Sequence, residues 1–337
     1  MKTSLKDCLP CLVIAGILLL NAACSDKDDP SLPEPEFIVR LLIAPSGLGD
    51  LSYNDNILRG VLEEQKEHPF QLEYAVPEDK KEAEQILRRW QADGDSPHHF
   101  TILAASGYEG LARRCLSSVS TRNYLLFDTR ADDLPISTFH FTGYGVSFLA
   151  GIAAYTQTKA EKAVYLGGQQ HETYIEDCYY GFRDGYLYAG GKEVVETYLS
   201  TAEGGFAMPH RAYEMADSLY RLYPFIYAMA GKSNTGIYHY LRENPGNGYT
   251  AGVDTDQSMY SDRIIGSMIK DIGGCIRRYI AMWMNGEELP ARKFYTLESG
   301  YTFFQIADTY KVGLEKTLSA SIPIAIQKEK EYESNKP

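Results

Sequence analysis

The sequence predicts an α/β fold built from parallel sheets that helices cover on both faces. Short apolar runs, such as FIVRLLIA from Phe37 and FTILAAS from Phe100, have the length of buried strands. Longer segments between them, such as residues 80–92, carry apolar residues at helical spacing. Because strands buried on both faces read as continuous apolar runs, this alternation indicates parallel sheets.

The expected strands fall into two series. The first consists of FIVRLLIA, FQLEYAV, FTILAAS and NYLLFDT, and the second of KAVYLGG, VVETYLS, FIYAMAG and GYTAGVD. These are too many strands for one comfortable sheet, and the pattern breaks near FHFTGYGVSF. We therefore place a first domain at residues 37–139 and a second βα series from about residue 147 to residue 253.

Composition excludes some classes of function. The chain has 337 residues, is 44% hydrophobic and 23% charged, and carries a formal net charge of −12. It contains no lysine- or arginine-rich block, so it lacks the electrostatic footprint of a nucleic-acid-binding protein. Cys115, Cys178 and Cys275 are too widely spaced for a disulfide framework or a zinc site and are expected to be small buried residues. We predict no metal site and no cofactor.

The N-terminus resembles a bacterial lipoprotein signal. A basic start is followed by the apolar run 12–20 and by two small residues before Cys24. We predict a signal peptide at residues 1–23, a lipid on Cys24, and a solvated acidic tether at residues 24–36. The acidic run after the cysteine also resembles the surface-export signal of Bacteroidetes lipoproteins. The alternative is an ordinary secreted protein with a lone cysteine.

Three enzyme motifs fail on individual residues. The turn at residues 231–233 after FIYAMAG resembles a phosphate-binding loop, but Ile226 stands where that motif needs glycine. Ser106 lies at a strand end without the flanking glycines of a nucleophile elbow. The stretch SGLGD does not complete a dinucleotide fingerprint. The sequence therefore predicts no catalytic residue.

The ends of the predicted strands carry polar and aromatic residues, and ligands of doubly wound sheets bind there. These residues are Asp50, Ser52, Tyr53, Asn54, Ser106, Gly107, Asp128, Phe206, Asp254 and Asp256, with the single lysine Lys270. Carboxylates suit a vicinal diol and aromatic faces stack on a flat ring, so the set fits a nucleoside. Asp254 and Asp256 could also form an acid/base pair or half of a metal site, but no nucleophile, perturbing neighbour or set of metal ligands accompanies them, so the sequence favours a clamp for hydroxyl groups. A strand-end aspartate can also simply cap a helix.

Four stretches make the chain resemble the basic membrane protein family of bacterial lipoproteins, whose purine-nucleoside receptors are substrate-binding parts of ABC transporters. They are GLGDLSYND, VSFLAGIAAYTQTKAEKAVYLGG, GFRDG from Gly181, and GVDTDQS with the later SMIK. Together they span the chain from Phe37 to about Asp308.

The resemblance implies a type I periplasmic-binding fold, with two α/β lobes, three chain crossings and a ligand cleft between the lobes. It places residues 37–139 and 255–290 in the N-terminal lobe, including a helix that would carry Lys270. Residues 140–254 and 291–325 would form the C-terminal lobe, and residues 326–337 a charged tail.

The resemblance also implies roles for the strand-end residues. Asp254 would accept the ribose hydroxyls, and Lys270 would contact the sugar or neutralise that carboxylate. The expected hydrogen-bonding residues are Asn54 and Asp128, and the expected aromatic sandwich is Tyr53 with Phe206. Asp50, Ser106 and Gly231 complete the predicted ligand-binding set, while Asp256 and Gln257 would hold the crossover in shape.

The chain departs from the family pattern at three places. One of the paired aspartates of the first loop is absent, which leaves Asp50 alone. The acidic residue expected before Ser147 is replaced by Gly145 and Val146, and the turn GKSNTG puts Lys232 near the expected cleft. A cation there could favour a phosphorylated ligand or point to solvent.

The predicted function is that of a lipid-anchored receptor that binds a nucleoside-like solute for an ABC permease and ATPase. Its place would be the periplasmic face or the outer-membrane surface of the cell envelope. A surface or sensory lipoprotein without a dedicated permease is the alternative, and an enzyme on the same fold is a third reading.

Overall fold

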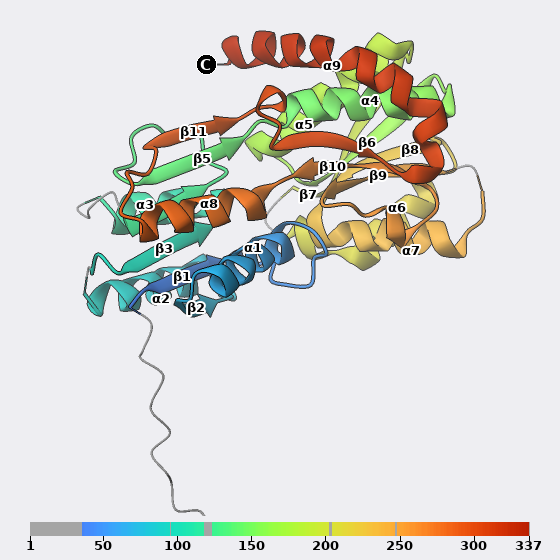
Figure 1. Cartoon of the computed structure of the whole chain (residues 1–337). Helices are drawn as coiled ribbons and strands as arrows, with labels where there is room; N and C mark the ends of the chain where they lie inside the picture. Colours follow the sequence, from blue (N-terminus) through green and yellow to red (C-terminus); the bar gives the residue numbers. More distant parts are fainter. Residues whose placement is uncertain (1–35, 95, 118–122, 202–203, 247, 337) are drawn as a thin grey trace, which may run out of the picture. The chain divides into compact units, whose positions relative to one another are not determined.

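Two six-stranded sheets form the framework of the protein (Figure 1). The computed structural model describes residues 36–94, 96–117, 123–201, 204–246 and 248–336, of which those from Phe37 onward form one compact unit. The predicted signal peptide, the predicted lipidation site Cys24 and nearly all of the predicted tether lie outside the described residues.

The first sheet has the strand order β11-β5-β4-β3-β1-β2, and all of its strands pair in parallel. Its strands are β1 (Ile38–Ile43), β2 (Gln71–Ala75), β3 (His99–Ala104), β4 (Tyr124–Phe127), β5 (Ser137–Phe141) and β11 (Arg292–Tyr295). The four central strands are buried along almost their whole length, as continuous apolar runs predict.

The second sheet has the order β12-β10-β9-β8-β6-β7. Its strands are β6 (Lys162–Gln169), β7 (Glu193–Ser200), β8 (Phe225–Met229), β9 (Tyr249–Asp254), β10 (Ile264–Lys270) and β12 (Thr302–Ile306). Only the edge strand β12 runs antiparallel to its neighbour. The predicted fold class, α/β with two doubly wound parallel sheets, is confirmed.

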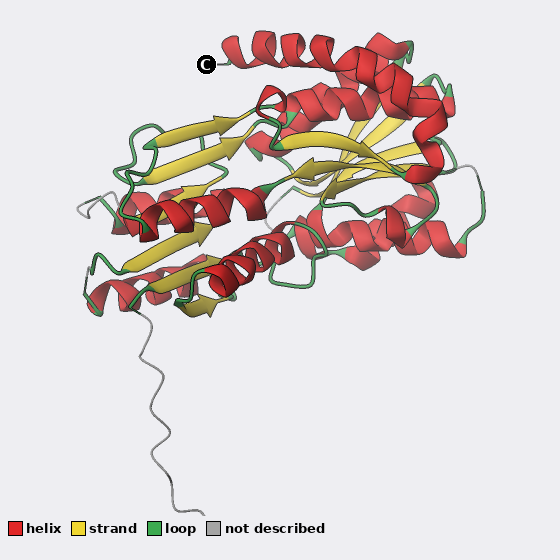
Figure 2. Cartoon of the chain, in the orientation of Figure 1, coloured by secondary structure: helices red, strands yellow, loops and turns green. Residues whose placement is uncertain are grey.

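Helices cover both faces of each sheet (Figure 2). They are α1 (Tyr53–Glu67), α2 (Lys80–Ala92), α3 (Glu109–Cys115), α4 (Tyr144–Thr158), α5 (Thr173–Ala189), α6 (Pro209–Leu219), α7 (Asn234–Glu243), α8 (Ile272–Met284) and α9 (Lys311–Ser334). Helix α8 packs on α1, and α4 packs on α5 and α9. We call the first sheet with α1, α2, α3 and α8 the first lobe, and the second sheet with the other helices the second lobe.

Three segments differ from the prediction. Lys270 ends strand β10 rather than lying on a helix, and β10 pairs with β9 in the second sheet. Strand β11 joins the first sheet by pairing with β5, although residues 291–325 were expected in the other lobe. The expected charged tail is the end of helix α9, where Glu329 is buried. A short apolar run has the same sequence pattern in a buried strand and in a buried helix, so the pattern alone does not decide between them. Which strands pair with each other is also not visible in the local sequence when the partners lie far apart along the chain.

The chain crosses between the lobes three times, as the resemblance implies: after β5, between β10 and α8, and between β11 and β12. Hydrogen bonds join these crossings. The Thr142 N–H donates to the Tyr295 carbonyl at 2.9 Å, and the Asp271 N–H donates to the Tyr301 carbonyl at 2.9 Å. The movement of the two lobes against each other remains a prediction.

The three cysteines of the described chain, Cys115, Cys178 and Cys275, are buried free thiols, which agrees with their predicted role as small core residues. Over the same described residues, no helix combines the length and the apolar character needed to span a membrane.

Candidate functional site

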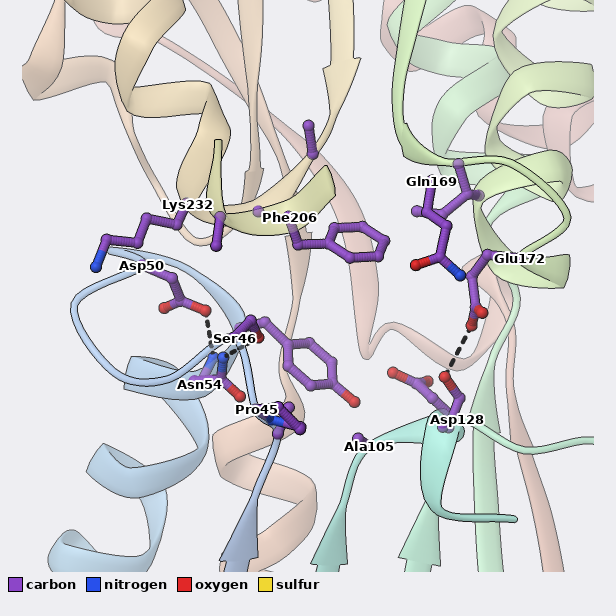
Figure 3. A pocket seen from close by; sticks show the side chains of 18 of the residues that line it. Pro45, Ser46, Asp50, Asn54, Ala105, Asp128, Gln169, Glu172, Phe206 and Lys232 are labelled. Carbon is purple, nitrogen blue, oxygen red and sulfur yellow. Dashed lines mark hydrogen bonds between the residues drawn. The ribbon is translucent and has the colours of Figure 1, made fainter. Parts of the chain in front are cut away.

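A pocket of about 490 Å³ lies at the carboxyl ends of strands from both sheets (Figure 3). This volume falls in the range of small-molecule sites. All nine residues predicted to bind ligand line it, namely Asp50, Tyr53, Asn54, Ser106, Asp128, Phe206, Gly231, Asp254 and Lys270. The structure therefore brings the predicted set together, while contact with a ligand stays a prediction.

Asp50 holds the first loop in shape. Its carboxylate accepts the backbone N–H groups of Ser52 at 3.0 Å, Asn54 at 2.8 Å and Asp55 at 3.2 Å. Burial raises the pKa of Asp50, and these backbone donors offset part of the rise. Its oxygens are thus largely occupied by the start of α1, so Asp50 lines the pocket as a cap more than as an open acceptor.

Asn54 presents an open acceptor. Its amide nitrogen donates to the Gly47 carbonyl at 2.8 Å and to the Ser46 hydroxyl at 3.2 Å. Its Oδ1 is buried and accepts no hydrogen bond from the described part of the chain. A buried acceptor without a donor is costly, so a ligand N–H or O–H placed there would stabilise the complex.

Lys270 joins the lobes at the floor of the pocket. Its ammonium is buried and donates to Asp128 Oδ2 at 2.7 Å. The same Nζ lies 4.1 Å from the ring centre of Tyr174 and 4.8 Å from that of Tyr53. Asp128 follows β4 of the first lobe and Lys270 ends β10 of the second, so the ion pair spans the two lobes.

Asp254 is the second buried carboxylate of this floor. It ends β9, and its Oδ2 accepts a hydrogen bond from the Ser52 hydroxyl of the other lobe at 2.5 Å. Burial raises the pKa of Asp254, and Lys270 and Ser52 offset only part of the rise. Burial is also the largest single influence on Asp128, but there Lys270, His140 and the Tyr53 hydroxyl together outweigh it and the pKa is lowered.

The backbone at both aspartates is left-handed, with φ of 61° at Asp128 and 63° at Asp254. This conformation is unfavourable for residues with a side chain, although aspartate tolerates it better than most. Such residues concentrate at binding and active sites, so the pair supports a functional role for this floor.

Phe206 forms an aromatic wall. It lies in the short 3₁₀ helix Gly205–Ala207, and its ring points toward Gln169 and Glu172 (Figure 3). A Cβ on Gly168 would lie 2.7 Å from this ring, so only glycine leaves room for it. Gly231 borders Phe206 as well and has a φ of 53°, so it shapes the pocket through its backbone.

Tyr53 and Lys270 also meet at the Asp128 carboxylate. Burial raises the pKa of Tyr53 well above its ordinary value, and the nearby Asp128 adds to the rise. The Tyr53 hydroxyl therefore keeps its proton at physiological pH and can donate a hydrogen bond.

Glu172 was missed by sequence reasoning. It lines the pocket, and its Oε1 accepts a hydrogen bond from the Ser106 hydroxyl of the opposite lobe at 2.8 Å. Burial raises the pKa of Glu172, and the Ser106 bond partly offsets the rise. Because Glu172 follows β6 by three residues, the same strand-end rule that gave the other residues could have found it.

Gln257 lies between β9 and β10, which both belong to the second sheet, so the lobe crossing expected directly after β9 is wrong and the chain crosses after β10. Gln257 instead ties this turn to the end of β9 and to the other lobe. Its Oε1 accepts the Val253 N–H at 3.0 Å, and its Nε2 donates to the Leu51 carbonyl at 3.0 Å. Asp256 is outside the pocket and accepts from the Ser258 N–H and from Gln305.

Lys232 lines the pocket and reaches over the first loop, away from Phe206 (Figure 3). Its Nζ would lie 3.9 Å from a Cβ built on Gly49. The carboxylates that line the pocket are Asp50, Glu78, Asp79, Asp128, Glu172 and Asp254, and the lysines are Lys80, Lys232 and Lys270. Acidic side chains therefore outnumber basic ones around the ligand space.

A group with metal-ligand geometry lies elsewhere, on and just after α1: Glu64, Glu67 and His68. Arg277 already pairs with Glu64 at 3.2 Å and with Glu67 at 2.6 Å. The arginine takes the place that a cation would occupy.

A pocket lined from two α/β lobes, at the strand ends of both and with three crossings between them, defines the class of two-lobed periplasmic-type binding proteins. The family model described as "Bmp: ABC transporter substrate-binding protein PnrA-like" matches residues 37–321, and the chain belongs to this family. The predicted family is thereby confirmed, and it is a family of binding proteins, not enzymes.

Individual relatives agree with this assignment. Basic membrane protein D of Borreliella burgdorferi (strain JD1) is 30% identical over 169 residues, which are 48% of this chain and 48% of that protein. The chain thus spans about half the length of the curated relatives it matches.

Solved structures share the fold. An ABC transporter solute-binding protein from Aeropyrum pernix K1 has a TM-score of 0.70 at 18% identity, covering 88% of this chain and 86% of that one. A transcriptional activator of the comK gene from Bacillus halodurans has a TM-score of 0.66 at 16% identity, covering 86% and 98%. At such identities the likeness shows the fold alone.

Proposed function

We propose that this protein binds a nucleoside, by preference a purine nucleoside, in the pocket between its lobes and delivers it to an ABC importer. The observation that carries the proposal is that one pocket holds both aromatic side chains and buried acceptors. Tyr53 and Phe206 offer ring surface, while Asp254 and Asn54 offer oxygens. A flat base beside a vicinal diol matches that combination.

The sugar would lie at the floor formed by Asp254, Asp128 and Lys270. A carboxylate can accept from two adjacent hydroxyls, and Asp254 is bonded by one hydroxyl, that of Ser52. Lys270 has three N–H donors, of which one reaches Asp128. The remaining donors suit hydroxyl oxygens of a sugar, and the buried Oδ1 of Asn54 suits an N–H of a base.

Transport would require partners. As a receptor, the protein would bind to a membrane permease and its ATPase. A lipid on Cys24 would keep it at the periplasmic face or the outer-membrane surface. The family match supports the receptor role, and the sequence of the first 24 residues supports the anchor.

The test is isothermal titration calorimetry on residues 25–337. Inosine, guanosine, adenosine and a pyrimidine nucleoside are titrated separately, with ribose and free purine as controls. We expect saturable binding of a purine nucleoside that Asp254→Ala weakens at least a hundredfold. The matched control is Asp256→Ala, since Asp256 lies two residues on and outside the pocket.

Absence of heat with every nucleoside, from protein with a normal unfolding transition, would overturn the nucleoside assignment. Equal losses in the two variants would instead remove Asp254 from the proposed contacts.

A further inference from the structure

Helix α9 extends past residue 321, where the family match ends, and its last turns lie against the chain crossings. Glu329 is the residue that makes the contact. Its side chain is 1% exposed, which is rare for a glutamate. A carboxylate is kept in such a place only when hydrogen-bond donors replace its water.

The donors to Glu329 come from two different crossings. Its Oε1 accepts from the Thr142 hydroxyl at 2.7 Å and from the Gly145 N–H at 3.1 Å, both at the first crossing, where β5 leads to α4. Its Oε2 accepts from the Leu297 N–H at 2.9 Å, at the crossing between β11 and β12. One carboxylate therefore ties the first crossing to the third.

The first turn of α4 is built to receive this carboxylate. Its N-cap position is Gly143, which has no side chain to bond the helix N–H groups. A Cβ on Gly145 would lie 2.8 Å from the carboxyl of Glu329, so glycine is required for the approach. Glu329 thus caps α4 from another helix, where the positive end of the helix dipole favours a negative charge.

No lysine or arginine forms an ion pair with Glu329 within the described chain, so the three donors and the helix end are its support. Burial raises the pKa of Glu329, and the bonds from Thr142, Leu297 and Gly145 offset part of the rise. A charge held this way depends strongly on its geometry, because a shift of either crossing would leave it unsatisfied.

A second contact of the same helix end also spans the lobes. Arg130, which follows β4 in the first lobe, donates to Asp177 of α5 at 3.0 Å and to Glu333 of α9 at 2.7 Å. Asp177 accepts from the Tyr332 hydroxyl at 2.9 Å as well. The end of α9 therefore contacts both lobes on either side of the crossings.

We propose that Glu329 is a positioning residue for ligand capture, which acts through the first and third crossings to hold the lobes near the separation seen here. In this arrangement Ser106 reaches Glu172 and Lys270 reaches Asp128 across the pocket. This inference rests on the proposed function in one respect, namely that the two lobes close on a bound ligand. When the fraction of molecules in the binding-competent arrangement falls, the apparent Kd rises by the same factor.

The experiment measures the separation of the lobes in the ligand-free protein by double electron–electron resonance between two spin labels. The protein used is residues 25–337. Spin labels are attached at Lys81→Cys on α2 and Arg211→Cys on α6, two exposed positions in different lobes, while the three cysteines of the described chain are buried. The test variant is Glu329→Gln. Its amide has one oxygen where the carboxylate has two, so its NH₂ group must face an N–H or hydroxyl donor from one of the crossings.

We expect Glu329→Gln to shift the distance distribution toward larger separations and, where a nucleoside binds the parent protein, to raise its Kd roughly tenfold. The control is Glu331→Gln, two residues on, which bonds Lys328 and Gln327 on the exposed side of α9. If Glu329→Gln does not fold, Thr142→Val replaces it, since this variant removes a single donor to the carboxylate.

Distance distributions of the test variants that coincide with that of Glu331→Gln would overturn the inference, whatever their melting temperatures. Because the distances are measured without ligand, failure of nucleoside binding in the parent protein leaves this result readable by itself.

Discussion

Asp128 and Asp254 occupy similar places in the two lobes, each at the end of a strand and each with a left-handed backbone, yet their pKa values shift in opposite directions. Lys270 lowers the pKa of both carboxyls, but it donates directly to Asp128, where His140 and the Tyr53 hydroxyl add to the effect, while Asp128 itself raises the pKa of Asp254. The floor of the pocket therefore combines one firmly ionised carboxylate with one that gains a proton more easily.

We expect nucleoside affinity to fall as the pH is lowered through the raised pKa of Asp254. The ionised form accepts two hydrogen bonds from the diol, and protonation turns one oxygen into a donor. Titration calorimetry from pH 7.5 down to pH 3.8, the ordinary pKa of an aspartate, measures the effect. Glu172 also has a raised pKa, so the series is repeated in Glu172→Gln to separate the two groups. A Kd that stays constant over this range would contradict the prediction.

We also expect a nucleoside to bind more tightly than its 5′-monophosphate. Six carboxylates and three lysines line the pocket, so a phosphate meets a net negative surrounding despite Lys232. A preference of about tenfold or more corresponds to about 1.4 kcal/mol. Competition titrations in the parent protein, in Lys232→Ala and in the surface control Lys81→Ala measure it. Tighter binding of the monophosphate that disappears in Lys232→Ala would establish the phosphorylated-ligand alternative.

For single residues, the rule that ligands bind at strand ends located the pocket but not the hydrogen-bond partners of each side chain. Asp50 and Asp254 look alike in sequence, and only the structure shows that backbone N–H groups occupy Asp50. The acid expected before Ser147 is absent from that stretch. A carboxylate nevertheless reaches Gly145 there, from Glu329, 184 residues away along the chain. No local pattern encodes such a contact.

At the element scale, the continuous apolar runs predicted eight strands, whereas β5, β10, β11 and β12 were not recognised as strands. Strand β11 is four residues long and half-polar, and β12 lies at a sheet edge with alternate residues exposed. Their sheet membership depends on pairings such as Arg292 with Thr138. Pairing of this kind is decided by tertiary packing and leaves no periodicity in the sequence.

The packing of α1 on α8 gives a prediction at this scale. A Cβ on Gly60 would lie 2.6 Å from Gly273 of α8, so Gly60→Ala must push the two helices apart. We expect a loss of roughly 1–3 kcal/mol in the free energy of unfolding, the usual cost of overpacking. Urea denaturation measures it. Gly313→Ala on α9 is the control, because nothing lies within 4 Å of its added Cβ. Equal stability of the two variants would contradict the close packing of α1 and α8.

At the scale of the whole molecule, the two lobes share one hydrophobic core. A single cluster of buried residues runs from β1 and β3 of the first sheet to β6 and β8 of the second, while two smaller clusters lie within single lobes. The chain also passes between the lobes three times. Unfolding one lobe would expose part of the shared cluster, so we infer that the lobes depend on each other for stability.

This inference predicts one cooperative unfolding transition, and the chain offers a direct way to measure it. Its two tryptophans, Trp90 on α2 and Trp283 on α8, both belong to the first lobe, so their fluorescence reports on that lobe alone. Far-UV circular dichroism reports on the helices of both lobes. We expect the two signals to give the same midpoint and slope in urea, as coincident probes do in a two-state transition. A fluorescence midpoint separated from the dichroism midpoint would show that the lobes unfold independently and that the shared cluster does not couple them.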